Sequence, residues 1–241
     1  MKPKAILNWS GGKDCAMALY ESRNKFDFCY LFTSVNSEFK RVSMHGLRVE
    51  LLHTQAEHIG IPIKKLLLPE MPSMKIYNNH MEKEMKDLKT EGINYSVFGD
   101  IFLEDLRLYR EEQLSNVAMQ GVFPLWKRNT KELLEQFLDL GFKAVIVCVN
   151  EKYLDKKFAG RILDKKFVHD IPANVDPCGE NGEFHTFVFD GPIFNNPVSY
   201  KKGEIVHRKY QQIGDEEKDN CFSSDKQNFD TGFWYCDILP Y

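Results

Sequence analysis

A short glycine-rich segment near the N-terminus has the composition of an anion-binding loop. It consists of Ser10, Gly11, Gly12, Lys13 and Asp14, between an apolar strand-like run, residues 4–9, and a helix-compatible stretch, residues 15–25. Glycines leave no Cβ between backbone N–H groups and a ligand, the lysine adds positive charge, and the start of a helix has a positive potential. We therefore predict that this loop binds phosphate, although five such residues also occur as an ordinary turn.

Two further polar clusters follow predicted strands. The first contains His45 and Gly46, just before a predicted helix, and the second is Gly99 with Asp100, at the end of an apolar strand-like run. A carboxylate at a strand end can hold Mg²⁺ against the phosphates of ATP. A histidine at a helix start is also common as a surface or capping residue, and an aspartate after a strand can simply close a turn.

The densest polar cluster spans residues 176–186. It combines two glycines, three acids, a thiol and an imidazole, and its Asn181-Gly182 pair is typical of a tight hairpin turn. Glu180, Glu183 and His185 are its candidates for chemistry. The local pattern alone is also compatible with an exposed hairpin that has no catalytic role.

Strand-like and helix-like patterns alternate in the first half of the chain. Predicted strands cover residues 4–9, 27–35, 62–68 and 95–101, and predicted helices cover 15–25, 47–59, 74–90 and 103–119. This alternation favours parallel strands joined by crossover helices, with ligands bound beyond the carboxyl ends of the strands. An apolar corner at 121–126 marks the expected boundary between a first domain, 1–127, and a smaller second domain, 128–241.

The second half has a different pattern. We expect helices over 130–140 and 159–169, strands over 142–150, 203–213 and 231–239, and a hairpin strand over 183–189. The polar stretch 214–228 is predicted to be a loop. The second domain is therefore predicted to be α+β.

Composition narrows the functional classes. The 241 residues are 43% hydrophobic and 28% charged, as in an ordinary globular protein, and the net charge of −3 argues against a nucleic acid partner. No signal-peptide pattern or membrane-length apolar run is present, so we expect a cytoplasmic protein without membrane partners. Six cysteines without a Cys-x-x-Cys pair argue against a structural zinc site.

These motifs, in this order, resemble the diphthine–ammonia ligase family of N-type ATP pyrophosphatases, and most closely its bacterial-type members. The matching segments are residues 10–14, Met44-His45-Gly46, Gly99-Asp100-Ile101, Pro124-Leu125-Trp126, Gly160-Arg161 and residues 178–183. The resemblance implies an α/β fold, a Rossmann-like parallel sheet of about five strands of the adenine nucleotide α-hydrolase type, followed by a smaller α+β domain. It also implies an enzyme that adenylates a carboxylate of diphthine on elongation factor 2, releases pyrophosphate and forms an amide with ammonia.

Site roles follow from this resemblance. Residues 10–15, His45, Gly46 and Gly99 would bind ATP, while Asp14 and Asp100 would hold Mg²⁺. Lys13 would stabilise the leaving pyrophosphate, Glu180 and Glu183 would orient the acceptor or bind ammonium, and His185 would move a proton. The partners are then ATP, a carboxylate-bearing acceptor and ammonia. The oligomeric state stays open, a homodimer included.

The sequence departs from the family at two points. Cys15 stands where pyrophosphate loops usually have serine, which removes a hydroxyl donor but leaves the backbone cradle. Phe184-His185-Thr186 replaces the Tyr-Glu-Thr run of ligases that act on diphthine, so the acceptor's identity stays open. Two alternatives also stay open: sulfur transfer to tRNA with Cys178 as the relay, and a sensor that binds adenine nucleotides without turnover.

Overall fold

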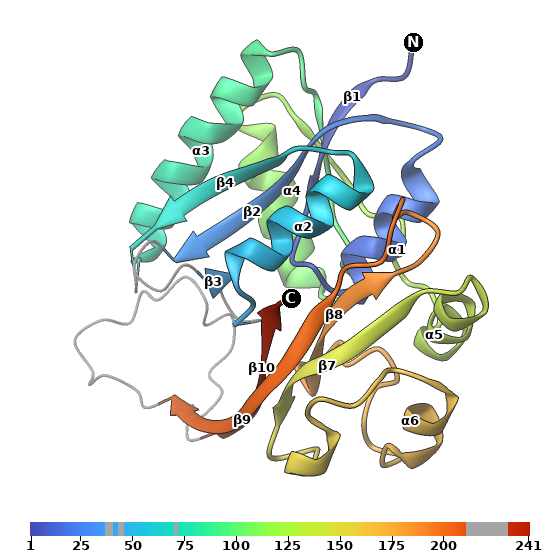
Figure 1. Cartoon of the computed structure of the whole chain (residues 1–241). Helices are drawn as coiled ribbons and strands as arrows, with labels where there is room; N and C mark the ends of the chain where they lie inside the picture. Colours follow the sequence, from blue (N-terminus) through green and yellow to red (C-terminus); the bar gives the residue numbers. More distant parts are fainter. Residues whose placement is uncertain (37–40, 43–45, 70–71, 211–230) are drawn as a thin grey trace.

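The computed structural model describes residues 1–36, 41–42, 46–69, 72–210 and 231–241, and Figure 1 shows the arrangement of their elements. Within these residues the chain forms two sheets. The first has five parallel strands in the order β4-β2-β1-β5-β6, and a short antiparallel strand, β3, pairs with the end of β2. Its strands are β1 (Lys4–Asn8), β2 (Asp27–Asn36), β3 (Arg41–Val42), β4 (Ile63–Leu68), β5 (Tyr95–Val97) and β6 (Gln120–Val122).

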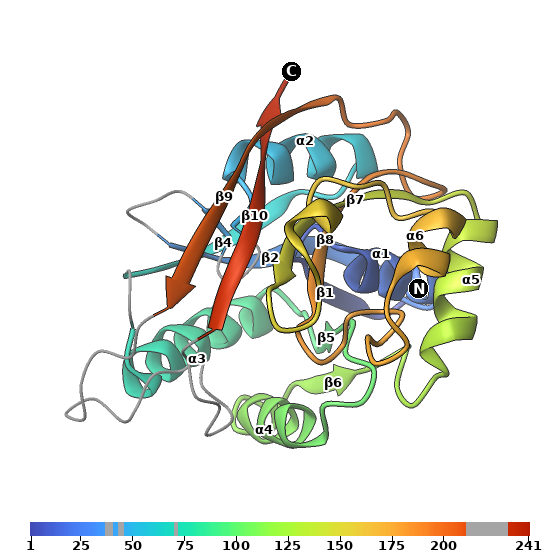
Figure 2. The same cartoon turned by 90° about the horizontal axis from the view of Figure 1, so that it is seen from below.

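Helices cover both faces of this sheet, as Figure 2 shows from below. They are α1 (Lys13–Ser22), α2 (Val49–Ile59), α3 (Met74–Thr90) and α4 (Glu104–Ser115). In the central strand β1, Ala5 and Leu7 face the core that contains α1 and α2, whereas Ile6 faces the core formed with α3 and α4. Side chains alternate across a strand, so a strand covered on both faces needs a continuous apolar sequence.

The second sheet is antiparallel and packs on the side of α1 and α2. Its strand order is β8-β7-β10-β9, and its apolar side chains belong to the same core cluster as those of α1 and α2. Its elements are α5 (Thr130–Asp139), β7 (Lys143–Asn150), the 3₁₀ helix η1 (Lys156–Phe158), α6 (Lys165–Asp170), β8 (Phe184–Asp190), β9 (Tyr200–Tyr210) and β10 (Thr231–Pro240). The predicted fold, a five-stranded parallel α/β sheet followed by an α+β part, is confirmed. The boundary at 127/128 falls between β6 and α5 and stays a prediction.

Three predicted elements were wrong in detail. The corner at 121–126 begins inside a strand, because Gln120–Val122 pairs with β5; three residues are too few to show a strand pattern. The helix expected over 159–169 begins only at Lys165, because Gly160 and Arg161 exchange backbone hydrogen bonds of 2.8 Å each with Ile146. The predicted hairpin does not form: β8 pairs with β7, and turns precede it.

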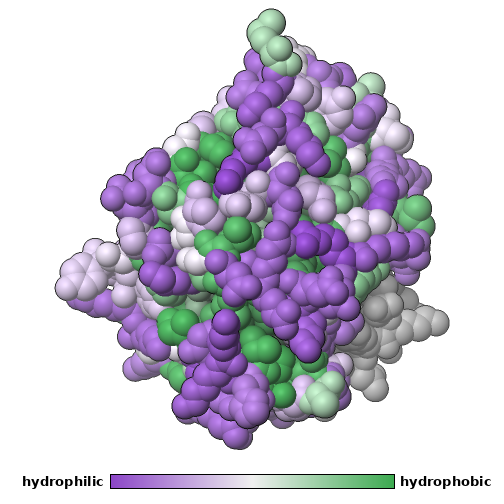
Figure 3. Space-filling view, turned by 90° about the vertical axis from the view of Figure 1, so that its right-hand side faces the viewer, coloured by the Kyte–Doolittle hydropathy of each residue, from purple (hydrophilic) through white to green (hydrophobic). Residues whose placement is uncertain are grey.

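No helix among the described residues is long and apolar enough to cross a membrane. Figure 3 shows one face of the molecule, on which hydrophilic side chains predominate and hydrophobic areas lie between them. Residues 214–228 of the predicted polar loop lie outside the described residues, as do the last three residues of the strand expected over 203–213.

Candidate active site

The glycine-rich loop joins β1 to α1 at the carboxyl edge of the parallel sheet. Gly11 has φ +81°, a conformation that favours glycine, and a Cβ there would lie 2.8 Å from Leu52. Gly12 is the N-cap of α1, and a Cβ on it would lie 3.2 Å from the Thr186 carbonyl oxygen. Glycine is therefore required at position 11, and a side chain at position 12 would be tightly packed. Cys15, in the first turn of α1, donates its thiol hydrogen to the Gly12 carbonyl, at 3.0 Å.

Strand β8 of the second sheet forms one wall of the loop. The Lys13 backbone N–H donates to Thr186 Oγ1 at 3.0 Å, and the Val188 N–H donates to the Gly11 carbonyl at 2.9 Å. The buried Gln55 amide on α2 donates to the carbonyls of Gly11, at 3.1 Å, and Val188, at 2.6 Å. The loop is thus held between the two sheets. The sequence analysis did not identify Gln55, although a glutamine among the buried apolar residues of α2 can indicate a buried hydrogen-bonding side chain.

Lys13 is a buried cation in direct contact with Asp14. Its Nζ lies 2.8 Å from both carboxylate oxygens, and the residue is only 4% exposed. Burial alone would lower the pKa of Lys13, but the negative charge of Asp14, helped by Glu180, raises it above its ordinary value. Lys13 therefore remains positively charged at neutral pH.

Gly99 brings Asp100 close to this pair. A Cβ on Gly99 would lie 2.7 Å from the Asp14 carbonyl carbon, so only glycine lets the end of β5 approach α1 this closely. Asp100 accepts a 2.7 Å hydrogen bond from Arg110 on α4. Burial raises the pKa of Asp100, and the neighbouring Asp14 charge adds to the rise, while Arg110 opposes it. No sequence signal connected Arg110 with the site.

Glu180 completes the group from the second half of the chain. Its Oε1 accepts hydrogen bonds from the backbone N–H groups of Ile101, at 2.9 Å, and Phe102, at 3.2 Å. Burial and the charge of Asp14 raise the pKa of Glu180 to about 7. Three predicted residues, Lys13, Asp14 and Glu180, thus interact electrostatically, and Asp100 joins them through Asp14. The carboxyl of Glu180 can exchange a proton near neutral pH.

The side chains of Glu183 and Cys178 are hydrogen-bonded to backbone groups of the protein. The buried Glu183 carboxylate accepts hydrogen bonds from the N–H groups of Asp176 and Asn181, both at 2.9 Å, and so closes the loop before β8. The Cys178 thiol donates to the Thr130 carbonyl at 3.3 Å, and burial raises its pKa to about 12. Cys178 is therefore a protonated, packed thiol at neutral pH.

His185 projects from the other face of β8. The side chains of Phe184 and Thr186 lie toward Lys13. The Phe184 ring centroid is 5.7 Å from Lys13 Nζ, and Thr186 Oγ1 is 3.0 Å from the Lys13 backbone nitrogen. Neighbouring residues of a strand point to opposite faces. This alternation places His185 on the face of β8 opposite Thr186, and its role in proton transfer stays a prediction. Gly46, with φ +66°, packs against Tyr235 just before α2, while His45 lies outside the described residues.

Asp14 and Asp100 are the candidate ligands of a magnesium ion. Within the described part of the chain, no three histidine, cysteine, aspartate or glutamate side chains gather to form a complete metal site. Mg²⁺ is commonly held by one or two carboxylates together with substrate phosphates and waters. Two acids beside the glycine-rich loop fit that arrangement. Their present partners, Lys13 and Arg110, would then have to share or release them.

Both halves of the chain match family models. Residues 3–120 match the diphthamide synthase N-terminal domain, and residues 129–219 match the diphthamide synthase C-terminal domain. The structure also overlaps with a predicted subunit of tRNA methyltransferase from Methanocaldococcus jannaschii, at 14% identity and a TM-score of 0.39, over 60% of this chain and 80% of that one. That likeness is too low to add to the assignment.

Several proteins named diphthine–ammonia ligase are similar to this chain in sequence. The Mus musculus protein is 30% identical over 229 residues, which are 86% of this chain and 85% of that protein. The Homo sapiens protein is 26% identical over 63% of this chain and 62% of its own length, and the Bos taurus protein is 29% identical over 49% and 45%. This chain therefore matches only about half to three fifths of those two relatives. The matches to both family models and to the Mus musculus protein show that the chain belongs to the diphthine–ammonia ligase family.

Proposed function

We propose that this protein is an ATP-dependent, AMP-forming amide ligase. The observation that carries the proposal is the cluster formed by the buried Lys13 cation, Asp14, Asp100 and Glu180 at a glycine-rich loop on the carboxyl edge of the sheet. The cluster offers a cation and loop for phosphate, and acids for a metal and a proton. Relatives named for ligation of ammonia support the same chemistry.

In the first step an acceptor carboxylate attacks the α-phosphorus of ATP, and the bond between the α-phosphorus and the bridging oxygen breaks. AMP is then attached to the acceptor as an acyl-adenylate, and pyrophosphate leaves. In this proposal Lys13 and free N–H groups of the loop stabilise the charge that grows on the leaving pyrophosphate, and such contacts accelerate a reaction because they strengthen in the transition state. Bound Mg²⁺, held by Asp14 and Asp100, would supply further neutralisation of the phosphates.

In the second step ammonia attacks the acyl carbon, and AMP leaves with the electron pair of the carbon–oxygen bond. The nitrogen must lose a proton as the amide forms. Glu180 is the candidate base, since its pKa of about 7 lets it accept a proton near neutral pH and its carboxylate is held by the Ile101 and Phe102 N–H groups. Glu183 supports this role indirectly, because it fixes the loop that carries Glu180.

The two alternatives have less support. A sulfur relay needs a thiolate, whereas the Cys178 thiol is buried and its pKa is raised to about 12. A sensor that binds nucleotide without turnover would not need a titratable carboxyl beside its phosphate loop.

Product analysis with α-labelled ATP tests the proposal. The protein would be incubated with ATP, Mg²⁺ and ammonium, with diphthine-bearing elongation factor 2 as the first acceptor and small carboxylic acids as the next. We expect AMP and pyrophosphate with the right acceptor, and loss of both in Lys13→Ala. ADP and phosphate as products would overturn the proposal. Tight ATP binding without turnover across all acceptors would favour the sensor.

A further inference from the structure

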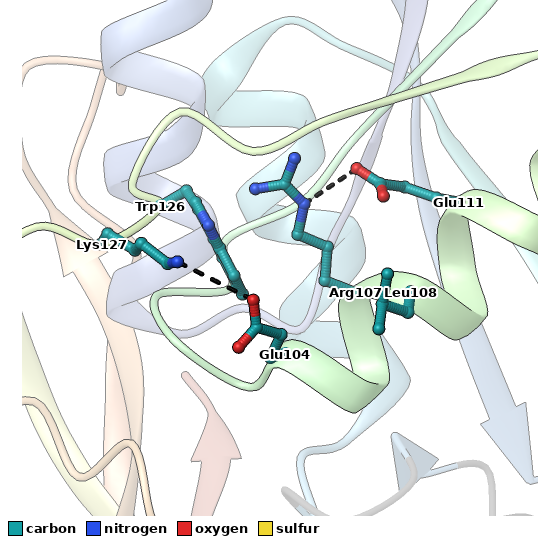
Figure 4. Close-up of a pocket in the computed structure, with 6 residues that line it drawn as sticks. All are labelled: Glu104, Arg107, Leu108, Glu111, Trp126 and Lys127. Carbon is teal, nitrogen blue, oxygen red and sulfur yellow. Dashed lines mark hydrogen bonds and ion pairs between the residues drawn. The ribbon is translucent and has the colours of Figure 1, made fainter.

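A pocket of about 250 Å³ lies beside the start of α4, and Figure 4 shows its lining. The first two turns of α4 and the turn after β6 form it. The residues that line it are Glu104, Arg107, Leu108, Glu111, Trp126 and Lys127. None of these side chains has a part in the chemistry proposed above.

Arg107 is fixed in this pocket as a flat cation. Its guanidinium carbon lies 4.8 Å from the Phe123 ring centroid and 4.6 Å from that of Trp126, and its Nε donates to Glu111 at 2.8 Å. The two terminal nitrogens have no hydrogen-bond acceptor among the described residues, and Figure 4 shows them projecting beyond the Glu111 contact. A guanidinium held in this way presents a pre-organised fork to a carboxylate.

Glu104 and Lys127 supply an acid and a base beside Trp126, with Lys127 across the ring from Arg107 in Figure 4. Their charged atoms are 3.8 Å apart, and their side chains are 69% and 66% exposed, so this ion pair is weak. Lys127 has φ +57°, uncommon for a lysine, and its N–H donates to the Ile101 carbonyl at 2.8 Å. The same Ile101 donates its N–H to Glu180, so one residue joins the pocket to the candidate active site.

The charges of the pocket balance, since two acids face two bases. A ligand with one charge would leave one pair unmatched, whereas a ligand with both charges satisfies both sides. We propose that this pocket binds the zwitterionic end of an amino acid, with its carboxylate on Arg107, its ammonium on Glu104 beside the Trp126 ring, and aliphatic carbons against Leu108. This inference rests on the proposed function: the acceptor would then be an amino acid with a further carboxylate that is activated by ATP.

Nuclear magnetic resonance titrations test the pocket without ATP. The probes are L-norleucine, which carries both charges, and hexanoate and pentylamine, which carry one charge each on similar carbon chains. We expect L-norleucine to shift the Trp126 indole resonance saturably, and each single-charge probe to bind at least tenfold more weakly. Arg107→Lys and Glu104→Gln should each weaken L-norleucine binding about tenfold, whereas Glu112→Gln, at an exposed position of the same helix, should leave it unchanged.

The outcomes separate this inference from the proposed function. Hexanoate binding as tightly as L-norleucine would overturn the zwitterion assignment, and so would no shift at all while AMP formation is intact. ATP moving the Trp126 resonance in competition with L-norleucine would assign the pocket to the nucleotide and overturn the inference. Saturable L-norleucine binding in a protein that never forms AMP would keep the pocket and refute only the ligase proposal.

Discussion

The carboxyl of Glu180 links the stability of this protein to its chemistry. In the folded protein its pKa is raised from 4.5 to about 7, first by burial and then by the charge of Asp14. The unfolded chain therefore releases the proton near pH 4.5, whereas the folded protein keeps it until about pH 7. Between these values the folded state binds more protons, so this carboxyl makes stability fall as the pH rises through that window.

The size of the effect follows from the shift. One pKa unit corresponds to about 1.4 kcal/mol, so ionisation of Glu180 costs the folded state roughly 2 to 3 kcal/mol between pH 5 and pH 8. Glu180→Gln does not titrate, and its amide oxygen can still accept from Ile101 and Phe102. Relative to the wild type, the variant should therefore gain roughly 2 to 3 kcal/mol in free energy of unfolding from pH 5 to pH 8.

Urea denaturation at pH 5, 6, 7 and 8 measures this difference directly, with Glu112→Gln as the matched control. The same variant should retain pyrophosphate release and lose amide formation by about 10²- to 10⁴-fold, the usual contribution of a general base. A stability difference between variant and wild type that stays constant across the pH range would refute the reasoning about Glu180 ionisation. Unchanged amide formation would refute its role as a base.

Three further substitutions test the architecture of the site. Gly99→Ala places a Cβ 2.7 Å from the Asp14 backbone and should cost about 1–3 kcal/mol in urea denaturation while raising the KM for ATP. Thr186→Val removes the acceptor of the Lys13 N–H and should cost about 1–3 kcal/mol, whereas Thr186→Ser should behave as wild type in the same assay. Cys178→Ser should keep most pyrophosphate release, and Cys178 should resist iodoacetamide at pH 7.5 in mass spectrometry of the native protein; rapid alkylation would contradict its burial.

Parts of the site that depend on local sequence were predictable. The glycine-rich loop and Asp100 each follow a strand, and the carboxyl ends of parallel strands meet at one edge of a sheet. The pattern of apolar residues was enough to place α3 with both ends correct. Short elements such as β6 were missed because three residues carry no periodicity.

The long-range contacts that hold the site together could not be predicted from sequence patterns. Thr186 meets Lys13 across 173 positions, Gln55 reaches Val188 across 133, and Glu180 binds Ile101 across 79. Such pairs form only because β8 pairs with β7, so that the second sheet can pack against α1 and α2.

The sequence by itself determined the glycine-rich loop after the first strand, the alternating elements and the family, because these depend on residue types and short spacings. Only the tertiary structure decided which polar residues share one site. It brought Glu180 close to Asp14, gave the Glu183 carboxylate backbone N–H partners and buried the Cys178 thiol. The physical reason is that pKa values and hydrogen-bond partners depend on burial and on charges brought close by folding, which chain distance does not encode.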